Sequence, residues 1–285
     1  MPESLSIIIK TFERPASLRN LLQSIRDQKL TYPILIADDS KVSSGAIIKK
    51  EFSDLSITYI DLPFDTGLSE GRNVLVNRVS TDFFLLCDDD YVFEERTDLK
   101  RAYYEICTNT LDLLGGEYYN YVNIPNLKVF VRQLTHPLRL KRFFLNQYKR
   151  SAYIGNFTIK GKDCELTVSY DPPSENISTC DLVNNFFIAR VSAVKDMGGW
   201  DKELKMGEHE DFFLRAKQHG LKVAFLANFG TGHYPAIPIK NSAYNQYRVR
   251  AAHFKQLFVK KYDFNNYIEK EKNSGKILFV HSKTH

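Results

Sequence analysis

The sequence predicts an α/β protein with a Rossmann-like, mostly parallel central sheet and helices on both faces. Short, almost continuous apolar runs recur along the first 112 residues, as in strands that are buried on both faces. Helical patterns separate these runs, and several of the runs end on aspartate. Because ligands bind at the carboxyl ends of parallel strands, we expect these acids at the mouth of a crevice.

The first half of the chain alternates between strand and helix. Residues 5–11 ("LSIIIKT") form a β-branched apolar run, and Pro15 opens a helix whose apolar residues recur at helical spacing. Ser69 is expected to cap a later helix. The other predicted elements are strands at 32–40, 56–62 and 83–87 and helices near 45–52 and at 69–80.

The second half is less regular. Residues 111–121 suggest a strand and a turn, and residues 180–201 suggest a strand, a short helix and a glycine turn. Residues 207–220 predict a helix with acids in its first turn, which suits the helix dipole, and residues 221–233 predict a strand. We therefore expect one main domain over 1–235 and a helical or irregular appendage over 236–285.

Composition bounds the class of protein. The chain has 285 residues, 43% of them hydrophobic, which is ample for a core, and its net charge of +5 is compatible with an anionic ligand. Its four cysteines lie far apart without a CxxC pair, so we expect reduced thiols. The N-terminus does not resemble a signal peptide, and no apolar run approaches the roughly 20 residues of a membrane span. These features predict a cytoplasmic protein.

One stretch is both basic and aromatic. Residues 138–150 carry several arginines and lysines, which suit a phosphorylated or lipid-linked acceptor or a peripheral contact with the membrane surface. A solvated loop face is the simpler interpretation. Because the remaining positive charge is diffuse and no recognition motif is present, nucleic-acid binding is not expected.

The acids of "LLCDDDYVF" indicate the chemistry. On a strand, Asp88 and Asp90 point to the same side and Asp89 points to the other. Two carboxylates aimed at one point suit Mn²⁺ or Mg²⁺, which in turn binds phosphate oxygens. The alternative is a solvated acidic turn. A second acidic pair at a strand end, Asp38 and Asp39, favours the metal interpretation.

Five segments carry a resemblance to a known family. They are "IIIKTFERP", "ILIADDS", "GLSEGRN", "FFLLCDDD" and "GEHEDFFLR", with His233 following the last. In order and spacing they resemble the inverting glycosyltransferases of the A-fold type, family 2, above all the animal β-1,4-N-acetylgalactosaminyltransferases. The resemblance covers about residues 5–235. It implies a glycosyltransferase A fold with a nucleotide-binding half over 1–112 and an acceptor-binding half over 113–235.

The resemblance also implies an activity. It implies transfer of a sugar, such as N-acetylgalactosamine, galactose or N-acetylglucosamine, from a UDP-sugar to a hydroxyl of a glycan or lipid-linked glycan. Inversion at the anomeric carbon and a Mn²⁺ or Mg²⁺ cofactor belong to the same expectation. Two alternatives remain: a nucleotidyltransferase and a nucleotide-sugar or glycan-binding protein without catalysis. A dinucleotide-dependent oxidoreductase is disfavoured because no GxGxxG follows the first strand.

Site residues follow from the resemblance. In such enzymes the position of Asp39 contacts the uracil base, and that of Arg72 contacts the base or the diphosphate, although Arg72 also fits a surface ion pair. The expected nucleotide-sugar residues are Thr11, Asp38, Asp39, Arg72, Asp88 and Asp89. The expected metal ligands are Asp88, Asp90 and His233. Trp200 is expected to stack on the acceptor sugar or to pack in the core.

The acceptor base is expected on the acidic helix, because inverting transfer needs one general base. Many members of the family that the sequence resembles use the aspartate of an "ED" pair some six residues before an arginine on this helix. Counting back from Arg215 in "EHEDFFLR" puts His209 at that position, whereas aligning on the adjacent acids selects Asp211, with Glu210 beside it. We favour Asp211 or Glu210. All three side chains also fit a purely electrostatic role at the start of a helix.

Overall fold

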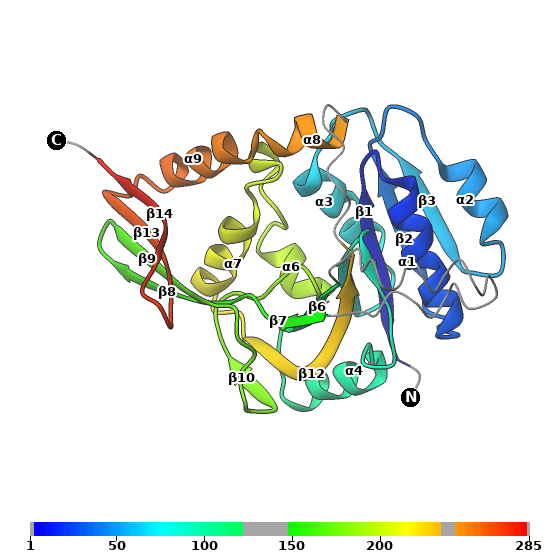
Figure 1. Ribbon diagram of the computed structural model, residues 1–285, viewed down its shortest axis with the longest axis horizontal. Helices are drawn as coiled ribbons and strands as arrows, with labels where there is room; N and C mark the ends of the chain where they lie inside the picture. Colours follow the sequence, from blue (N-terminus) through cyan, green and yellow to red (C-terminus); the bar gives the residue numbers. More distant parts are fainter. Residues whose placement is uncertain (1–2, 122–147, 235–242, 284–285) are drawn as a thin grey trace, which may run out of the picture.

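The computed structural model describes residues 3–121, 148–234 and 243–283 (Figure 1). Its centre is a ten-stranded sheet with the order β10-β12-β6-β11-β4-β1-β2-β3; β5 pairs with β12, and β7 pairs with β6. The strands are β1 (Leu5–Thr11), β2 (Ile34–Asp38), β3 (Ile57–Asp61), β4 (Phe83–Asp88), β5 (Tyr91–Val92), β6 (Leu113–Tyr121), β7 (Tyr148–Ser151), β10 (Ile177–Thr179), β11 (Phe187–Arg190) and β12 (Val223–His233).

The parallel part of this sheet brings the acidic strand ends together. β1 pairs in parallel with both β2 and β4, and β2 pairs in parallel with β3. The registers place Thr11 beside Asp38 and Lys10 beside Asp88. The carboxyl ends of these strands therefore meet at one edge of the sheet, as the sequence predicted. The antiparallel strand β11 then joins β4 to β6, which makes the sheet mixed.

Helices cover both faces of the sheet (Figure 1). One face packs against α1 (Pro15–Asp27), α2 (Gly45–Glu51) and α4 (Leu99–Thr108) in one apolar cluster. The other face packs against α3 (Leu68–Arg78), α6 (Val191–Asp196) and α7 (His209–Gln218) in a second cluster. The expected α/β architecture is thereby confirmed.

The C-terminal part differs from the expected helical appendage. It contains α8 (Ala243–Arg248) and α9 (Ala251–Lys261), but then forms two strands, β13 (Asn266–Glu271) and β14 (Ile277–Ser282). With β8 (Ile154–Lys160) and β9 (Asp163–Ser169) these strands build a separate sheet of order β14-β13-β9-β8. β13 pairs in parallel with β9, so the end of the chain is built into the structure of the second half.

Two local predictions were wrong. Gly67 rather than Ser69 caps α3, since the turn needs a φ of 97° and the Ser69 hydroxyl donates to the Lys205 carbonyl instead. Residues 113–121 form one strand without a turn. Gly115 serves close packing there, because a Cβ on it would lie 2.4 Å from Cβ of Val183. The other expected elements are present.

Two expectations concern surfaces. Within the described ranges, no helix has both the length and the apolar character required to cross a bilayer. Of the basic stretch 138–150, residues 138–147 lie outside the described residues. Of the residues that are described, Arg150 donates two hydrogen bonds to the buried carboxylate of Glu117, at 2.5 and 2.6 Å. Arg150 therefore has a structural role, because it neutralises the buried carboxylate of Glu117.

Candidate functional site

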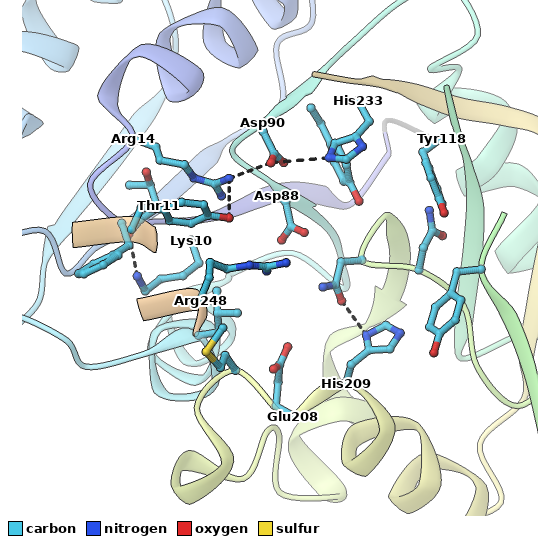
Figure 2. Close-up of a pocket in the computed structure, with 18 of the residues that line it drawn as sticks. Lys10, Thr11, Arg14, Asp88, Asp90, Tyr118, Glu208, His209, His233 and Arg248 are labelled. Atoms are coloured by element: carbon cyan, nitrogen blue, oxygen red, sulfur yellow. Dashed lines mark hydrogen bonds and ion pairs between the residues drawn. The ribbon is translucent and has the colours of Figure 1, made fainter. Parts of the chain in front are cut away.

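A pocket of about 740 Å³ opens at the carboxyl edge of the sheet. The ends of β1 and β4 and the residues after β2 form one wall, and the start of α7 forms another (Figure 2). Tyr153 and Tyr170 add aromatic rings beside β8 and β9, and Tyr244 and Arg248 enter from α8. The pocket is thus shared among residues from both halves of the main domain and from the C-terminal segment.

Asp39 and Lys10 form one corner of the pocket. Both side chains are buried and joined by an ion pair, and the second carboxylate oxygen of Asp39 accepts from the Gly67 amide at 2.7 Å. Burial lowers the pKa of Lys10, although the charge of Asp39 opposes the change. Asp38 does not line the pocket, because its carboxylate accepts from the Ser40 amide and the Tyr59 hydroxyl.

The three aspartates at the end of β4 point in two directions, as the sequence analysis predicted. Asp88 and Asp90 line the pocket, whereas Asp89 is fully buried, accepts from the Thr11 hydroxyl at 2.6 Å and pairs with Arg14. Arg14 also donates to Asp90 at 2.8 Å (Figure 2). Burial raises the pKa of Asp89 to about 7. The guanidinium of Arg14, which the sequence analysis did not select, therefore balances part of this acidic turn.

The two pocket-facing carboxylates fit a divalent cation. Burial raises the pKa of Asp88, and the nearby charge of Asp90 adds to this, so a cation between them would stabilise the ionised form. His233 lines the pocket beside them: its Nε2 lies 3.7 Å from Asp90 Oδ2, and its Nδ1 lies 2.6 Å from Oδ1 of Asn120. Across the described residues, no group of three or more histidine, cysteine or acidic side chains could hold a metal ion. One or two carboxylates with substrate phosphates is nevertheless a usual Mg²⁺ environment.

The "GRN" segment is structural here. Arg72 is completely buried and does not line the pocket; it donates to Glu208 at 2.5 Å and to Asp88 at 3.3 Å. Asn73 exchanges two hydrogen bonds with the backbone of Trp200, each of 2.8 Å. Trp200 is buried against Phe212, with ring centroids 4.3 Å apart, and it does not line the pocket either. The expected ligand contacts of Arg72 and Trp200 are therefore absent from this arrangement.

The start of α7 presents Glu208 and His209 to the pocket. Glu208 is paired with Arg72, as described above. Nδ1 of His209 lies 3.0 Å from Oδ1 of Asn185, so the neutral ring donates there and keeps its lone pair on Nε2. Nε2 is buried and has no hydrogen-bond partner among the residues that the structure describes. Burial lowers the pKa of His209 to about 4, so the ring is neutral near pH 7.

Glu210 and Asp211 are turned away from the pocket. Glu210 pairs with Lys255 of α9 at 2.8 Å. Asp211 is fully buried and bonds Arg215 at 2.9 Å, Lys261 at 2.5 Å and the Tyr262 hydroxyl at 2.9 Å. Neither side chain lines the pocket. The two acids favoured as the base are therefore structural ion-pair partners, and His209 is the one candidate of the three at the pocket wall.

Several pocket residues were missed by the sequence analysis. Tyr153 stacks with Tyr170, their ring centroids 5.7 Å apart, and also lies 5.6 Å from the ring of His209. Tyr118 lines the same side, beside His233. No local motif marks these tyrosines, since Tyr118 lies on β6, Tyr153 lies between β7 and β8, and Tyr170 follows β9, so that only the fold brings them together.

Comparison with known proteins agrees with this geometry. The profile described as "Glycosyl transferase family 2" matches residues 6–162, more than half of the chain. Beta-1,4 N-acetylgalactosaminyltransferase 1 of Mus musculus is 33% identical over 210 residues, and that of Rattus norvegicus is 31% identical over 209. Each alignment covers 73% of this chain but only 35% of the relative. The chain thus spans about a third of the length of these relatives.

Solved structures show the same fold. The S. aureus TarS 1–349 structure superimposes with a TM-score of 0.53 and 18% identity, covering 81% of this chain and 59% of that one. TarS 1–349 in complex with UDP gives a TM-score of 0.54, also with 18% identity, and covers 89% of this chain and 69% of that one. The likeness is in architecture, a mostly parallel sheet with helices on both faces.

Proposed function

The chain belongs to glycosyl transferase family 2, and on that premise we propose that it transfers a sugar from a UDP-sugar to a hydroxyl of a glycan or glycolipid. One observation carries the proposal. The acidic turn after β4 and His209, whose buried Nε2 has no hydrogen-bond partner among the described residues, line a single pocket that Asp39 also lines. N-acetylgalactosamine is the first sugar to test, since the similar mammalian proteins are named for it.

Donor recognition is assigned to the edge of the sheet. Asp39 and Lys10 present an acceptor and a donor side by side, which suits the N3–H and a carbonyl oxygen of uracil. Asp88 and Asp90 would hold Mn²⁺ or Mg²⁺. Such a cation supplies Lewis-acid stabilisation of the charge on the departing diphosphate.

Acceptor activation is assigned to α7. His209 faces the donor-side carboxylates across the pocket (Figure 2). Nε2 would take the proton of the acceptor hydroxyl while its oxygen bonds to the anomeric carbon and the bond from that carbon to the diphosphate breaks. One displacement of this kind inverts the anomeric centre. Glu208, the other ionisable group at this end of α7, is already engaged by Arg72. Tyr153 and Tyr170 offer aromatic faces for the acceptor sugar.

The test is UDP release from UDP-sugars in the presence of a glycan acceptor, with Mn²⁺ and with EDTA. We expect release that needs acceptor and is lost in EDTA, and a product whose anomeric configuration, read by NMR, is opposite to that of the donor. Retention of configuration would refute the single displacement. Activity that persists in EDTA would refute the metal assignment alone, and no turnover with any UDP-sugar would favour a binding protein.

A further inference from the structure

We propose that Arg248, on the short helix α8, binds the diphosphate of the donor; this rests on the proposed function. The residue lines the pocket, and Figure 2 shows its side chain extending from α8 into the space between the walls. No hydrogen bond or ion pair joins its guanidinium to any residue that the structure describes. An arginine that faces a pocket with all its donors open is suited to an anionic ligand.

The other cations around the pocket are already committed. Lys10 is paired with Asp39, and Arg14 is paired with Asp89 and Asp90. Arg72 behind the wall is paired with Glu208 and lies 3.3 Å from Asp88. Among the described lysines and arginines at the pocket, the charge of Arg248 is therefore the one left for a ligand. A diphosphate carries several negative charges and needs such a partner.

Contacts on both sides of Arg248 hold it in place. The Tyr244 hydroxyl accepts from Arg14 at 3.0 Å, and the Tyr244 ring lies 4.3 Å from the Arg14 guanidinium carbon. Two residues after Arg248, Arg250 forms a two-pronged ion pair with Asp65, at 2.7 and 2.9 Å. The Asp65 amide in turn donates to the Asp39 carbonyl. The segment is thus tied to the acidic turn on one side and to the Asp39 corner on the other.

This position defines the chemistry of the ligand. The diphosphate must lie between the uracil corner and the acidic turn, and the Tyr244 and Arg250 anchors tie the segment that carries Arg248 to both. A guanidinium there can form two parallel hydrogen bonds to phosphate oxygens and stabilise the charge that grows as the sugar leaves. An anionic acceptor, such as a phosphorylated or carboxylated glycan, would offer similar chemistry, and the experiment separates the two sources.

The experiment measures the Kd of UDP and of uridine for the wild type, Arg248→Gln and Arg248→Lys by calorimetry, with uridine measured by competition. Losing a hydrogen-bonded charge should weaken UDP binding about 10- to 100-fold, while uridine binding stays unchanged because uridine has no phosphate. Arg248→Lys should recover part of the loss. Arg19→Gln, which removes the same charge from an exposed pair with Glu51, is the matched control and should bind UDP like the wild type.

Three results would overturn the inference. Equal UDP affinity in Arg248→Gln and the wild type would show that Arg248 does not contact the diphosphate. If the same variant also had a raised KM for the acceptor, Arg248 would be assigned to the acceptor instead. Equal loss of UDP and uridine binding would show that the substitution disturbs the pocket rather than a phosphate contact. A wild type that binds UDP no better than uridine would instead refute the proposed function itself. Thermal unfolding of each variant checks that the fold is kept.

Discussion

Replacing His209 by glutamine is the most direct test of the acceptor base. A positioned general base typically contributes about 10²- to 10⁴-fold to a rate, and its efficiency rises as its pKa approaches the working pH. Burial lowers the pKa of His209 to about 4, well below neutral pH. We therefore expect a loss of kcat at the lower end of this range, about 10²-fold, which corresponds to about 2.7 kcal/mol of barrier.

The assay compares kcat for UDP release with the Kd of UDP. His209 lies across the pocket from Lys10, the partner of Asp39, so the Kd should remain close to that of the wild type (Figure 2). Glu210→Gln and Asp211→Asn are the matched controls from the same helix. Each removes one of the two carboxylate partners of a partly buried lysine, because Lys255 keeps Glu269 and Lys261 keeps Asp201. Each should therefore lower the unfolding free energy yet turn over near the wild-type rate while folded. A fully active His209→Gln, or an inactive but folded control, would refute the assignment.

Three further predictions follow from the same pocket. Asp39→Asn should raise the Kd of UDP about 10-fold or more, whereas Asp38→Asn, whose carboxylate faces Ser40 and Tyr59, should lower thermal stability but leave the Kd unchanged. Asp90→Asn should abolish the Mn²⁺ dependence of UDP binding, measured by titration in Mn²⁺ and in EDTA. If the variant kept this dependence, Asp90 would be excluded as a metal ligand. In urea unfolding, the free energy by which the wild type exceeds His209→Gln should rise between about pH 4 and 6.5, by at most about 3 kcal/mol, because the lowered pKa of His209 leaves the unfolded wild-type chain with more bound protons in that window. The comparison cancels the opposite contribution of Asp89, whose pKa burial raises to about 7, and a difference that does not change with pH would contradict the lowered pKa of His209.

The donor side of the site was predictable because its signals are local. Apolar runs define buried strands, and parallel pairing then forces the ends of β1, β2 and β4 to one edge. Once that edge is fixed, Asp39, Asp88 and Asp90 must lie near one another, and strand alternation separates Asp89 from its neighbours. No long-range information is needed for either step.

The sequence did not reveal which side chains of α7 line the pocket, because ion-pair partners are set by tertiary packing. Helical spacing places Glu208 and Asp211 on one face of a helix, but Glu208 is the N-cap of α7 and points into the pocket. Asp211 is bound by Lys261 and Tyr262, which lie 50 residues further along the chain. Nothing near "HEDFF" reveals that the packing of α9 on α7 neutralises this acid, so sequence alone could not separate the candidates.

Pairing within the described chain sets His209 and Arg248 apart from Arg72, Glu210 and Asp211. The last three each resembled site residues, and the fold gives each a charged partner at 2.9 Å or less. His209 Nε2 and the Arg248 guanidinium have no such partner although both lie at the pocket. Burying an unsatisfied polar atom such as His209 Nε2 costs free energy, which a ligand in the pocket would offset, whereas the exposed guanidinium of Arg248 is open to a ligand. The two groups are complementary to the two ends of the proposed reaction: a hydroxyl that must lose a proton and a diphosphate that gains negative charge.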